Sequence, residues 1–570
     1  MNKITVIISC LLIMVSYRVQ ATDFETATEA VKNMGVGWNL GNTLEANSQT
    51  VTDVTQAGYW GQQDLNSETC WGQYVTKPEL LKMMKDAGFG AIRVPVTWYN
   101  HLDQDGKVNA AWMARVREVV DYVISQGMYC IINVHHDTGA DSESFKSWIK
   151  ADEANYATNK TRFENLWKQI AEEFKDYDQK LLFEGYNEML DKISSWCFAS
   201  FASSGKYDAA IARSAYNAIN SYAHSFVSTV RATGGNNARR NLIVSTYAAC
   251  CGSGTWNAHL KDPLSNMKMP DGESNHLIFE VHDYPNIENG LAAAKAEVDD
   301  MISALNTHLI AKGAPVIIGE WGTSNVDKGD GKTDYDVRRS VMFDFVDYFV
   351  KQAKANNIAT FYWMGLTDGA ARLFPAFHQA DLALKIVQAY HGSSFTPTLP
   401  TRADYKNVTI SGTVNFTQQY AEFNIFKGSV TSAEASAIEL ELESAPASGS
   451  LQFKVYSSNK TKAITEATSK FVFMPAMGTI TQITLQWLKP AAGSVKVKGA
   501  WLLRRDGTRE PCDPSVYWGC YMTDVNTVTG IRTITTDAVS DGRTYNLLGQ
   551  PVATPVKGVY IRGGKKFVNK

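Results

Sequence analysis

The sequence predicts an α/β protein, a (β/α)8 TIM barrel followed by an all-β sandwich. Two observations carry this prediction. First, eight short apolar runs are mostly separated by segments with the apolar spacing of helices, and second, the C-terminal third changes to a pattern in which every second residue is apolar. At 570 residues the chain exceeds what one hydrophobic core usually holds, so more than one domain is expected. A formal net charge of -3 points to no nucleic-acid partner and no anionic-membrane partner.

The first 21 residues have the composition of a signal peptide. Lys3 supplies the positive charge, residues 4–15 are apolar, and Val19-Gln20-Ala21 forms a small-residue cleavage site. The apolar run is too short to cross ~30 Å of hydrocarbon comfortably, and no later segment is long and apolar enough to span a membrane. We therefore expect export, cleavage after Ala21, and a secreted or cell-surface protein.

Eight apolar runs are the expected strands of the barrel. They begin near Met34, Ala91, Tyr129, Leu181, Asn241, Leu277, Val316 and Thr360. Helices are expected between them, at about 159–177, 209–232, 290–311 and 334–356. A doubly wound open sheet is the alternative, but residues 35–38 lack the third glycine and the helix start of a phosphate-binding turn.

The first crossover shows the expected pattern most clearly. Residues 76–79, Thr-Lys-Pro-Glu, predict a helix start with a capping box, in which Thr76 is the cap. An apolar stripe follows over residues 80–87, and Gly88 ends the helix. Residues 91–95 then enter as the second strand.

Polar and aromatic residues concentrate at the ends of the predicted strands. In a barrel the functional loops follow the C-terminal ends of the strands, so one rim is expected to carry these side chains. They are Trp38, Asn39 and Asn42, then Arg93, Trp98 and Tyr99, then Asn133, His135, His136 and Asp137, then Asn187 and Glu188, then His282, Asp283 and Tyr284, then Glu320 and Trp321, and finally Trp363.

Glu188 and Glu320 end the fourth and seventh runs. Two carboxylates on one rim are the constellation for glycoside hydrolysis, in which one protonates the leaving oxygen and the other attacks the anomeric carbon. We assign Glu320 as the nucleophile, because Arg93 and Tyr284 could keep it ionised by charge and hydrogen bond. Glu188, with His282 as a proton-side neighbour, is assigned as the acid and later the base. These roles predict retention of configuration, with the carboxyl groups ~5 Å apart.

Metal-dependent hydrolysis is the alternative chemistry, because residues 135–137, His-His-Asp, and the pair His282-Asp283 resemble pieces of a metal site. Adjacent side chains alternate between the two faces of a strand and seldom bind one ion together. We therefore predict neither a metal nor another cofactor. Acyl transfer is not supported either, because the sequence contains no GxSxG elbow.

Nine rim residues have substrate-binding or supporting roles in this interpretation: Arg93, His135, His136, Asn187, His282, Tyr284, Trp363, Asn39 and Trp98. A hydrogen-bonded support pair is the alternative for His136 and Asp137. For His135 we expect contact with a sugar hydroxyl or with Asn187. Five loop tryptophans would suit a long open cleft for a polysaccharide: Trp60, Trp71, Trp98, Trp196 and Trp256.

Seven segments, 37–44, 92–98, 134–136, 183–188, 281–285, 318–322 and 362–363, together resemble glycoside hydrolase family 5. The opening and fourth-strand segments look most like its subfamily 4 endoglucanases, and the resemblance covers about residues 25–392. It implies a retaining endo-β-1,4-glucanase (a cellulase), in which Asn187 binds the hydroxyl at carbon 2 and Trp363 stacks beneath the same sugar. The residues that match the family's active-site positions are Arg93, His135, Asn187, Glu188, His282, Tyr284, Glu320 and Trp363.

The substrate implied by this resemblance is a β-linked polysaccharide of plant cell walls. Relatives of this type act on cellulose, mixed-linkage glucan, xyloglucan, xylan and mannan, so a β-mannanase or xylanase of the same fold is an alternative. A catalytically silent polysaccharide-binding protein is a further one, but such a protein would be expected to have lost a carboxylate, and Glu188 and Glu320 are both present. We expect a monomer.

The C-terminal third has a different organisation. Residues 22–392 would form the catalytic domain and 393–401 a linker rich in Ser, Thr and Pro. Segments within 402–524 alternate strictly, which predicts a β-sandwich. It would be either a carbohydrate-binding module or a spacer, because four of its aromatic residues, Trp487, Trp501, Tyr517 and Trp518, suit a binding surface or a core equally. Cys512 and Cys520 could close a small loop by a disulfide, which the sequence leaves open.

The last segment, 525–570, resembles the C-terminal sorting tails of secreted Bacteroidetes proteins. Residues 545–550 and 557–561 carry the resemblance. It implies surface delivery or secretion through the outer membrane, and a small β-domain that stays attached is the alternative.

Overall fold

The computed structural model describes residues 24–47, 64–139, 147–191, 207–253, 259–270, 275–323, 332–363, 365–459, 462–529, 544–545, 558–562 and 565–569. The predicted signal peptide lies outside these residues, as do Trp60, Trp196 and Trp256. The chain divides into two compact units: Met1–Asp404 with the short segment Gly519–Tyr521, and Tyr405–Trp518 with Met522–Lys570.

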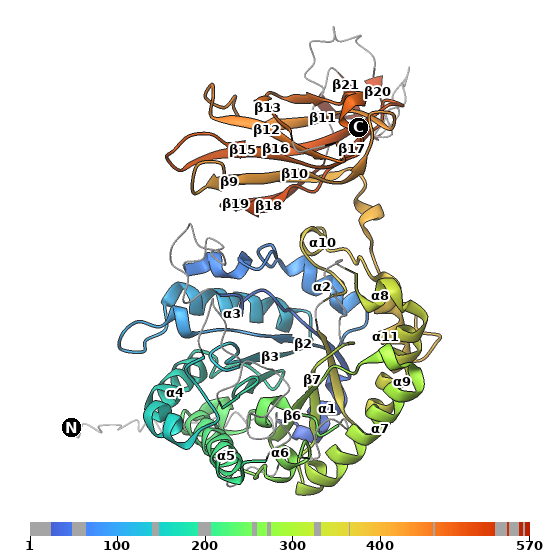
Figure 1. Cartoon of the computed structure of the whole chain (residues 1–570). Helices are drawn as coiled ribbons and strands as arrows, with labels where there is room; N and C mark the ends of the chain where they lie inside the picture. Colours follow the sequence, from blue (N-terminus) through green and yellow to red (C-terminus); the bar gives the residue numbers. More distant parts are fainter. Residues whose placement is uncertain are drawn as a thin grey trace, which may run out of the picture. The chain divides into compact units, whose positions relative to one another are not determined.

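The first unit is a closed barrel of eight parallel strands (Figure 1). Its strands are β1 (Val36–Asn39), β2 (Ala91–Val94), β3 (Tyr129–Asn133), β4 (Leu181–Glu184), β5 (Leu242–Ser245), β6 (Leu277–Asp283), β7 (Val316–Trp321) and β8 (Ala359–Trp363). Each strand pairs with its neighbours in chain order, and β8 closes the barrel on β1. Every predicted apolar run is therefore a strand, and the barrel is confirmed over the open sheet.

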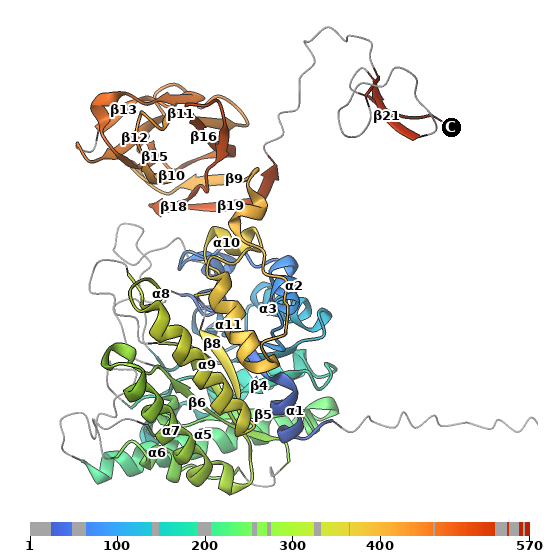
Figure 2. The same cartoon turned by 90° about the vertical axis from the view of Figure 1, so that its right-hand side faces the viewer.

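Helices surround the barrel strands (Figure 2). They are α1 (Ala27–Met34), α2 (Pro78–Asp86), α3 (Ala110–Ser125), α4 (Glu153–Glu173), α5 (Ala209–Ala232), α6 (Asp262–Ser265), α7 (Leu291–His308), α8 (Asp334–Val337), α9 (Arg339–Ala355), α10 (Ala370–Leu373) and α11 (Ala380–His391). α4 begins earlier than predicted because the Asp152 side chain caps it by accepting from the backbone N–H of Asn155. Among the described residues no helix has the length and apolar character needed to cross a membrane.

The predicted capping box at the start of α2 is wrong. Lys77 occupies the N-cap position, and its side chain makes no capping hydrogen bond. The backbone N–H of Thr76 instead donates to Glu68 Oε1 at 2.7 Å, and the Thr76 carbonyl accepts from Arg115 Nη2 at 2.8 Å. Thr76 thus lies one residue before the cap position, and its backbone is bound by the buried ion pair of Glu68 and Arg115.

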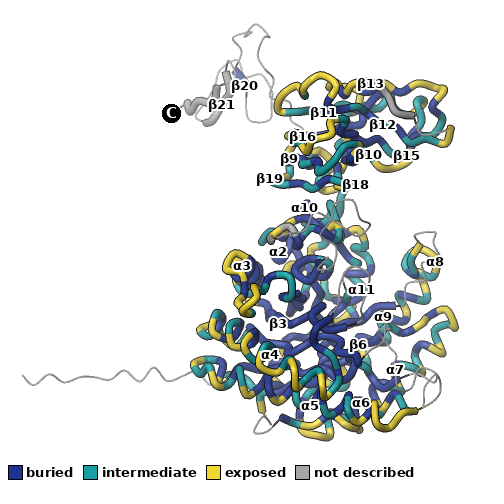
Figure 3. Tube along the Cα trace, turned by 60° about the vertical axis from the view of Figure 1, so that its left-hand side comes forward, coloured by how far each residue is buried: buried dark blue, intermediate teal, exposed yellow. Residues whose placement is uncertain are grey.

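The barrel interior has an apolar floor and a polar layer above it. The strand residues of the floor, which α1 covers, are Ala91, Tyr129, Ile131, Leu182, Ile243, Ile278, Ile317, Ala359 and Phe361. The next inward position on most strands is polar, because side chains on one face recur every second residue. These residues, Asn39, Arg93, Asn133, Glu184, Ser245 and Glu280, are completely buried. Figure 3 shows the strands β3 and β6 in the dark blue of buried residues. Buried polar groups are costly unless they are paired, so this layer requires a complete set of partners.

The second unit is a β-sandwich, which confirms the predicted fold class. Its strands are β9 (Val408–Phe416), β10 (Glu422–Val430), β11 (Ala435–Leu442), β12 (Leu451–Ser457), β13 (Lys462–Glu466), β14 (Lys470–Val472), β15 (Ile480–Trp487), β16 (Gly493–Arg504), β17 (Arg509–Pro511), β18 (Ser515–Trp518) and β19 (Cys520–Thr529). One sheet has the order β13-β12-β15-β10-β18 and the other the order β14-β11-β16-β9-β19. Farther on, β20 (Thr544–Tyr545), β21 (Gly558–Arg562) and β22 (Lys565–Asn569) form a small antiparallel sheet.

Arg240, just before β5, joins the base of the barrel through its guanidinium. Nη1 donates to the Leu181 carbonyl at 2.6 Å, Nη2 to the Tyr177 carbonyl at 2.8 Å, and Nε to Asn237 Oδ1 at 2.8 Å. The side chain is fully buried and also lies over the Phe183 ring. It therefore ties the end of α4 to the start of β4.

Arg240→Met should lower the free energy of unfolding by about 3 kcal/mol or more, because several buried carbonyls would lose their donor at ~1–3 kcal/mol each. Urea or thermal denaturation measures the change. Arg239→Met, at the exposed neighbouring position, is the matched control and should stay within about 0.5 kcal/mol of the parent. Equal midpoints for the two variants would contradict this role for Arg240.

Candidate active site

Arg93 organises the polar layer. Its Nε and one Nη2 proton bind the two oxygens of Glu184 at 2.6 and 2.7 Å. Nη1 donates to Glu320 Oε1 at 2.8 Å and to Asn39 Oδ1 at 3.0 Å. Nη2 also donates to Asn187 Oδ1 at 2.7 Å. All five guanidinium N–H groups thus have acceptors, which is what complete burial demands.

A bulge in β7 turns Glu320 toward the barrel interior. Ile317 faces inward in the apolar floor, so strict alternation would point Glu320 outward, toward the helices. β6 and β7 pair in regular register as far as Ile318, and the next pair joins Glu320 to His282. Gly319 is therefore an extra residue, and a bulge of this kind reverses the faces of the residues that follow it.

Glycine is required at the bulge by close approach. A Cβ atom at Gly319 would lie only 1.6 Å from Glu280 Oε1. Trp321 then faces outward, where its ring stacks on Phe349 of α9 at a centroid distance of 4.3 Å. The bulge thereby places a carboxylate inside the barrel and an indole in the outer core.

Glu320 accepts a hydrogen bond on each oxygen. Arg93 binds Oε1, and the Tyr284 hydroxyl donates to Oε2 at 2.8 Å. Burial, and then the negative charge of Glu320, raises the pKa of Tyr284 well above its usual value, so the phenol stays a donor. Both predicted partners of Glu320 are confirmed, and the pair of donors suits a carboxylate that reacts without a proton.

Glu188 lies across the site from Glu320 and contacts His282. The Glu188 side chain is nearly buried, and its Oε1 lies 2.7 Å from His282 Nδ1. Burial raises the pKa of Glu188 and the charge of Glu320 raises it further, while His282 opposes both. The net direction is upward, toward a carboxyl that carries a proton. The predicted neighbour is confirmed.

His282 is itself held between carboxylates. Its Nε2 lies 3.5 Å from Glu280 Oε1, and its Nδ1 lies 3.5 Å from Glu320 Oε2. Burial alone would lower the pKa of His282, but Glu320, Glu188 and Glu280 together raise it to about 10. The imidazole is therefore a cation that links the deep polar layer to Glu188.

Glu184 and Glu280 were not predicted at this site, and Asn133 was predicted only as a rim residue without an assigned role. Glu184 receives Arg93 and also accepts from Asn133 Nδ2 at 2.8 Å, while Glu280 Oε2 accepts from Ser245 Oγ at 2.8 Å. Glu280 stands two residues before His282 on the same strand, so period two was the signal that could have revealed it. Glu280 is easily missed, because a charged residue within an apolar strand is usually assumed to point away from the core.

His135 lies beside Glu320 and stacks on Trp363. The His135 ring stacks parallel to Trp363 at a centroid distance of 6.0 Å, and its Nε2 is 4.0 Å from Glu320 Oε1. Its Nδ1 pairs with Asn133 Nδ2 at 3.0 Å, where Asn187 was the protein partner predicted. Burial, and then the nearby His136 and Arg93, lowers the pKa of His135 well below its usual value, so the ring is neutral.

The remaining predicted residues divide into supporting and peripheral ones. Asn39 is completely buried and donates to the backbone carbonyls of Gly319 and Phe361 at 2.9 and 3.1 Å, so it supports Arg93 from below. His136 lies 5.3 Å from the ring of Trp71, which is partly exposed. Burial, and then Arg93, lowers the pKa of His136 to about 3.

Trp98 is not a cleft residue, which corrects the prediction that it lines the substrate path. Its side chain is completely buried, and its Nε1 donates to the Asn133 carbonyl at 2.9 Å. Asp137 accepts from the Trp98 backbone N–H at 2.8 Å and from Trp148 Nε1 at 2.6 Å. Trp98 and Asp137 therefore brace the loops behind His135.

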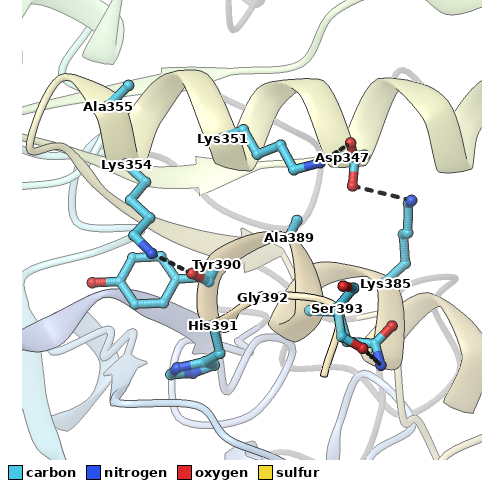
Figure 4. Close-up of a pocket in the computed structure, with 11 residues that line it drawn as sticks. Asp347, Lys351, Lys354, Ala355, Lys385, Ala389, Tyr390, His391, Gly392 and Ser393 are labelled. Atoms are coloured by element: carbon cyan, nitrogen blue, oxygen red, sulfur yellow. Dashed lines mark hydrogen bonds and ion pairs between the residues drawn. The ribbon is translucent and has the colours of Figure 1, made fainter. Parts of the chain in front are cut away.

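A surface pocket of about 530 Å³ lies elsewhere, between α9 and α11 (Figure 4). Lys351 and Lys385 both reach Asp347, at 2.6 and 3.1 Å, and Lys354 donates to the Tyr390 carbonyl at 2.5 Å. None of the residues that line it belongs to the carboxylate cluster, so it has no part in the site.

Glu188, His282 and Glu320 each place one ligand-type atom within 4.8 Å of the others. This triad differs from the His-His-Asp and His-Asp pieces that suggested a metal in the sequence. Its chemistry favours proton transfer over ion binding, because both Glu320 oxygens already accept hydrogen bonds from Arg93 and Tyr284. The permanent positive charge of Arg93 would also repel a cation at this position.

A family model described as cellulase, glycosyl hydrolase family 5, matches residues 52–367. The chain belongs to this family. Endoglucanase B from Neocallimastix patriciarum is 33% identical over 381 residues, which are 64% of this chain and 71% of that protein. Among solved structures, a broad-specificity subfamily 4 endoglucanase from an uncultured bacterium is 66% identical with a TM-score of 0.61, and covers 65% of this chain and 96% of its own.

A family 5 enzyme from Prevotella bryantii B14 is 40% identical with a TM-score of 0.55, and covers 65% of this chain and 99% of its own. The similarity to these structures thus extends over about two thirds of the chain. This cellulase-family protein is a glycoside hydrolase of the endoglucanase type.

His282→Gln should move the basic limb of the pH–rate profile upward. That limb reports loss of the proton from the acid, which is Glu188 in our assignment, and His282 lowers the pKa of Glu188. Without the imidazolium the proton is held to higher pH, while kcat/KM at the optimum falls about tenfold or more. Profiles of β-glucan hydrolysis measure both effects, and His224→Gln, at an exposed position of α5, is the control. A basic limb that stays in place or moves down would contradict this role.

Proposed function

We propose that this endoglucanase cleaves β-1,4-linked plant cell-wall glucans by double displacement with retention of configuration. One observation carries the proposal: an oxygen of Glu188 and an oxygen of Glu320 lie within 4.8 Å of each other. Retaining glycosidases hold their two carboxyl groups about 5–5.5 Å apart, whereas inverting ones need about 6.5–9.5 Å to admit a water between them. The short separation supports direct attack by one carboxylate on the sugar.

In the first step Glu320 attacks the anomeric carbon, and a carbon–oxygen ester bond forms. The glycosidic bond breaks, and Glu188 gives its proton to the departing oxygen. In the second step the Glu188 carboxylate takes a proton from water, which attacks the same carbon and releases Glu320. The hydrogen bonds from Arg93 and Tyr284 orient the Glu320 carboxylate for attack and stabilise it when it departs in the second step.

Asn187 and Trp363 would hold the sugar that becomes covalently attached. Arg93 binds Asn187 Oδ1 at 2.7 Å, which turns the Nδ2 donor the other way, toward the hydroxyl at carbon 2. A hydrogen bond at that hydroxyl strengthens as charge develops in the transition state. Trp363, parallel to His135, supplies a flat face for the sugar ring.

Xyloglucan and mixed-linkage glucan are included in the proposed substrate range. The enzyme from an uncultured bacterium named above, 66% identical to this chain, is a broad-specificity endoglucanase. A mutant of the Prevotella bryantii enzyme, 39% identical to this chain, was solved with a xyloglucan tetradecasaccharide. The proposed class is therefore β-1,4-glucan with tolerance for substituents or mixed linkages, ahead of mannan or xylan.

A panel of soluble cellulose, mixed-linkage glucan, xyloglucan, xylan and mannan tests the proposal. Release of reducing ends should be greatest on the glucans, and the first product observed by NMR should have the β configuration. Glu320→Gln should abolish activity, and Glu188→Gln should reduce it by about 10²–10⁴-fold, because it removes general acid catalysis. Chelator treatment should change nothing. Activity retained by both variants, or α-configured first products, would overturn the mechanism.

We also propose that the protein is exported and reaches the cell surface or the medium. The basic and apolar start with a cleavage site after Ala21, and the sorting-like segment 525–570, support this. Expression of the full chain in a Gram-negative host should yield an exported protein whose first residue is Thr22, detectable by N-terminal peptide mapping. Ala21→Arg should block this cleavage. Wild-type exported protein that keeps Met1 would contradict the proposal.

A further inference from the structure

The five-stranded sheet of the sandwich has an outward face that is polar yet largely buried. Along β10, β12 and β15, alternate residues such as Phe423, Phe453 and Leu485 fill the core. The residues between them form the outward face: Glu422, Asn424, Gln452, Lys454, Tyr456, Gln482, Thr484 and Gln486. Glu422, Asn424, Thr484 and Gln486 are among the buried polar residues, which is unusual for a face that does not pack in the core.

Glu422 is the centre of this polar face, at 5% exposure. Lys454 Nζ and Gln486 Nε2 reach Glu422 Oε1 at 2.6 and 3.2 Å. The Tyr456 hydroxyl and Thr484 Oγ1 donate to Oε2 at 2.7 and 2.9 Å. These four hydrogen bonds fix the positions of the donor side chains, and the negative charge of Glu422 balances the positive charge of Lys454.

Amides extend the network on both sides of Glu422. Gln452 Nε2 donates to Gln486 Oε1 at 2.7 Å, and Gln482 Nε2 donates to Asn424 Oδ1 at 2.5 Å. Asn424 Nδ2 continues to Ser515 Oγ of β18 at 3.3 Å. The face is thus a preorganised array of neutral hydrogen-bonding groups that reaches the edge strand of the sheet.

Two exposed aromatic rings stand on that edge strand. Tyr517 and Trp518 are 44% and 50% exposed. Trp518 pairs with Glu422 in the β10–β18 register, and the Tyr517 ring lies 6.5 Å from the Tyr456 ring. Both rings therefore adjoin the polar face.

Trp487 and Trp501 behave differently, although the sequence offered all four aromatics as equal candidates. Both are buried: Trp487 stacks on Phe416 at 5.4 Å, and Arg509 covers Trp501 at 4.2 Å. They belong to the body of the sandwich. The structure thus separates two core tryptophans from the two aromatic residues at the edge of the polar face.

We propose that this face of the sandwich binds a β-linked glucan chain, with Tyr517 and Trp518 stacking on sugar rings and the amide array meeting their hydroxyls. A pyranose has an apolar face and a polar rim, which this combination matches. The Lys454–Glu422 pair leaves the array without net charge, so it does not suit nucleic acid or an acidic polymer. The choice of glucan rests on the proposed function of the barrel.

Binding to insoluble cellulose by the full chain carrying Glu320→Gln tests the proposal, because this parent cannot digest the support. Adding Tyr517→Ala and Trp518→Ala together should weaken binding about thirtyfold, since about 1 kcal/mol for each ring makes about 2 kcal/mol in all. Both side chains are exposed, so the thermal midpoint should not change. Val472→Ala, also exposed but on the other sheet, is the matched control and should bind like the parent.

Unchanged binding by the double variant would overturn the proposal, as would an equal loss in Val472→Ala. Tighter binding of the parent to insoluble mannan than to cellulose, abolished by the double variant, would overturn the glucan assignment.

Hydrolysis separates this inference from the proposed function. In the active chain, Trp518→Ala should cleave soluble cello-oligosaccharides at the parental rate and release less sugar from insoluble cellulose. A parent that cleaves no glucan would defeat the proposed function, while the cellulose-binding comparison would still decide the role of the sandwich.

Discussion

A fully buried guanidinium needs an acceptor for each of its five N–H groups, and Arg93 finds them on three other strands and the loop after β4. Glu184 takes two, and Asn39, Asn187 and Glu320 take one each. Removing one partner from such a buried set lowers the stability of the fold by about 3–5 kcal/mol, so arrangements that lack a partner are strongly disfavoured. The requirement that keeps Arg93 paired also fixes the positions of Glu320, the proposed nucleophile, and of Asn187, the residue proposed to bind the sugar.

Charge balance in this layer explains how neighbouring carboxyls can differ. Glu280 lies deep: burial would raise its pKa, but Arg93 and His282 lower it on balance. Glu188 lies at the rim, where burial raises its pKa by more than His282 and Arg93 lower it. His282 lies between the two carboxyls. The negative charge of Glu280 helps to keep the imidazole of His282 protonated, and this cation contacts Glu188. One carboxyl remains an anion and another holds a proton, although both belong to the same cluster.

The sandwich also contains a charged side chain whose hydrogen bonds organise its neighbours. Glu422 gathers four donors on an outer sheet face, much as Arg93 gathers acceptors in the barrel. Such networks are costly if incomplete and rigid when complete. A rigid polar face beside exposed rings has little conformational entropy to lose on binding a chain of sugars.

The sequence by itself determined the eight strands, the change to a sandwich, and the rim on which Glu188 and Glu320 stand, because hydrophobic period and strand ends are local properties. It also indicated Arg93, Tyr284 and His282 as their neighbours. Other features depended on tertiary structure. Trp98 is a bracing residue because its indole is buried and donates to the Asn133 carbonyl. Thr76 is not the cap because the helix begins one residue later than predicted, with Lys77 at the cap position. Glu320 faces inward only through the bulge at Gly319, since strict alternation along β7 would have placed it among the helices. Pairing between strands decides such a reversal, and no single strand carries that information.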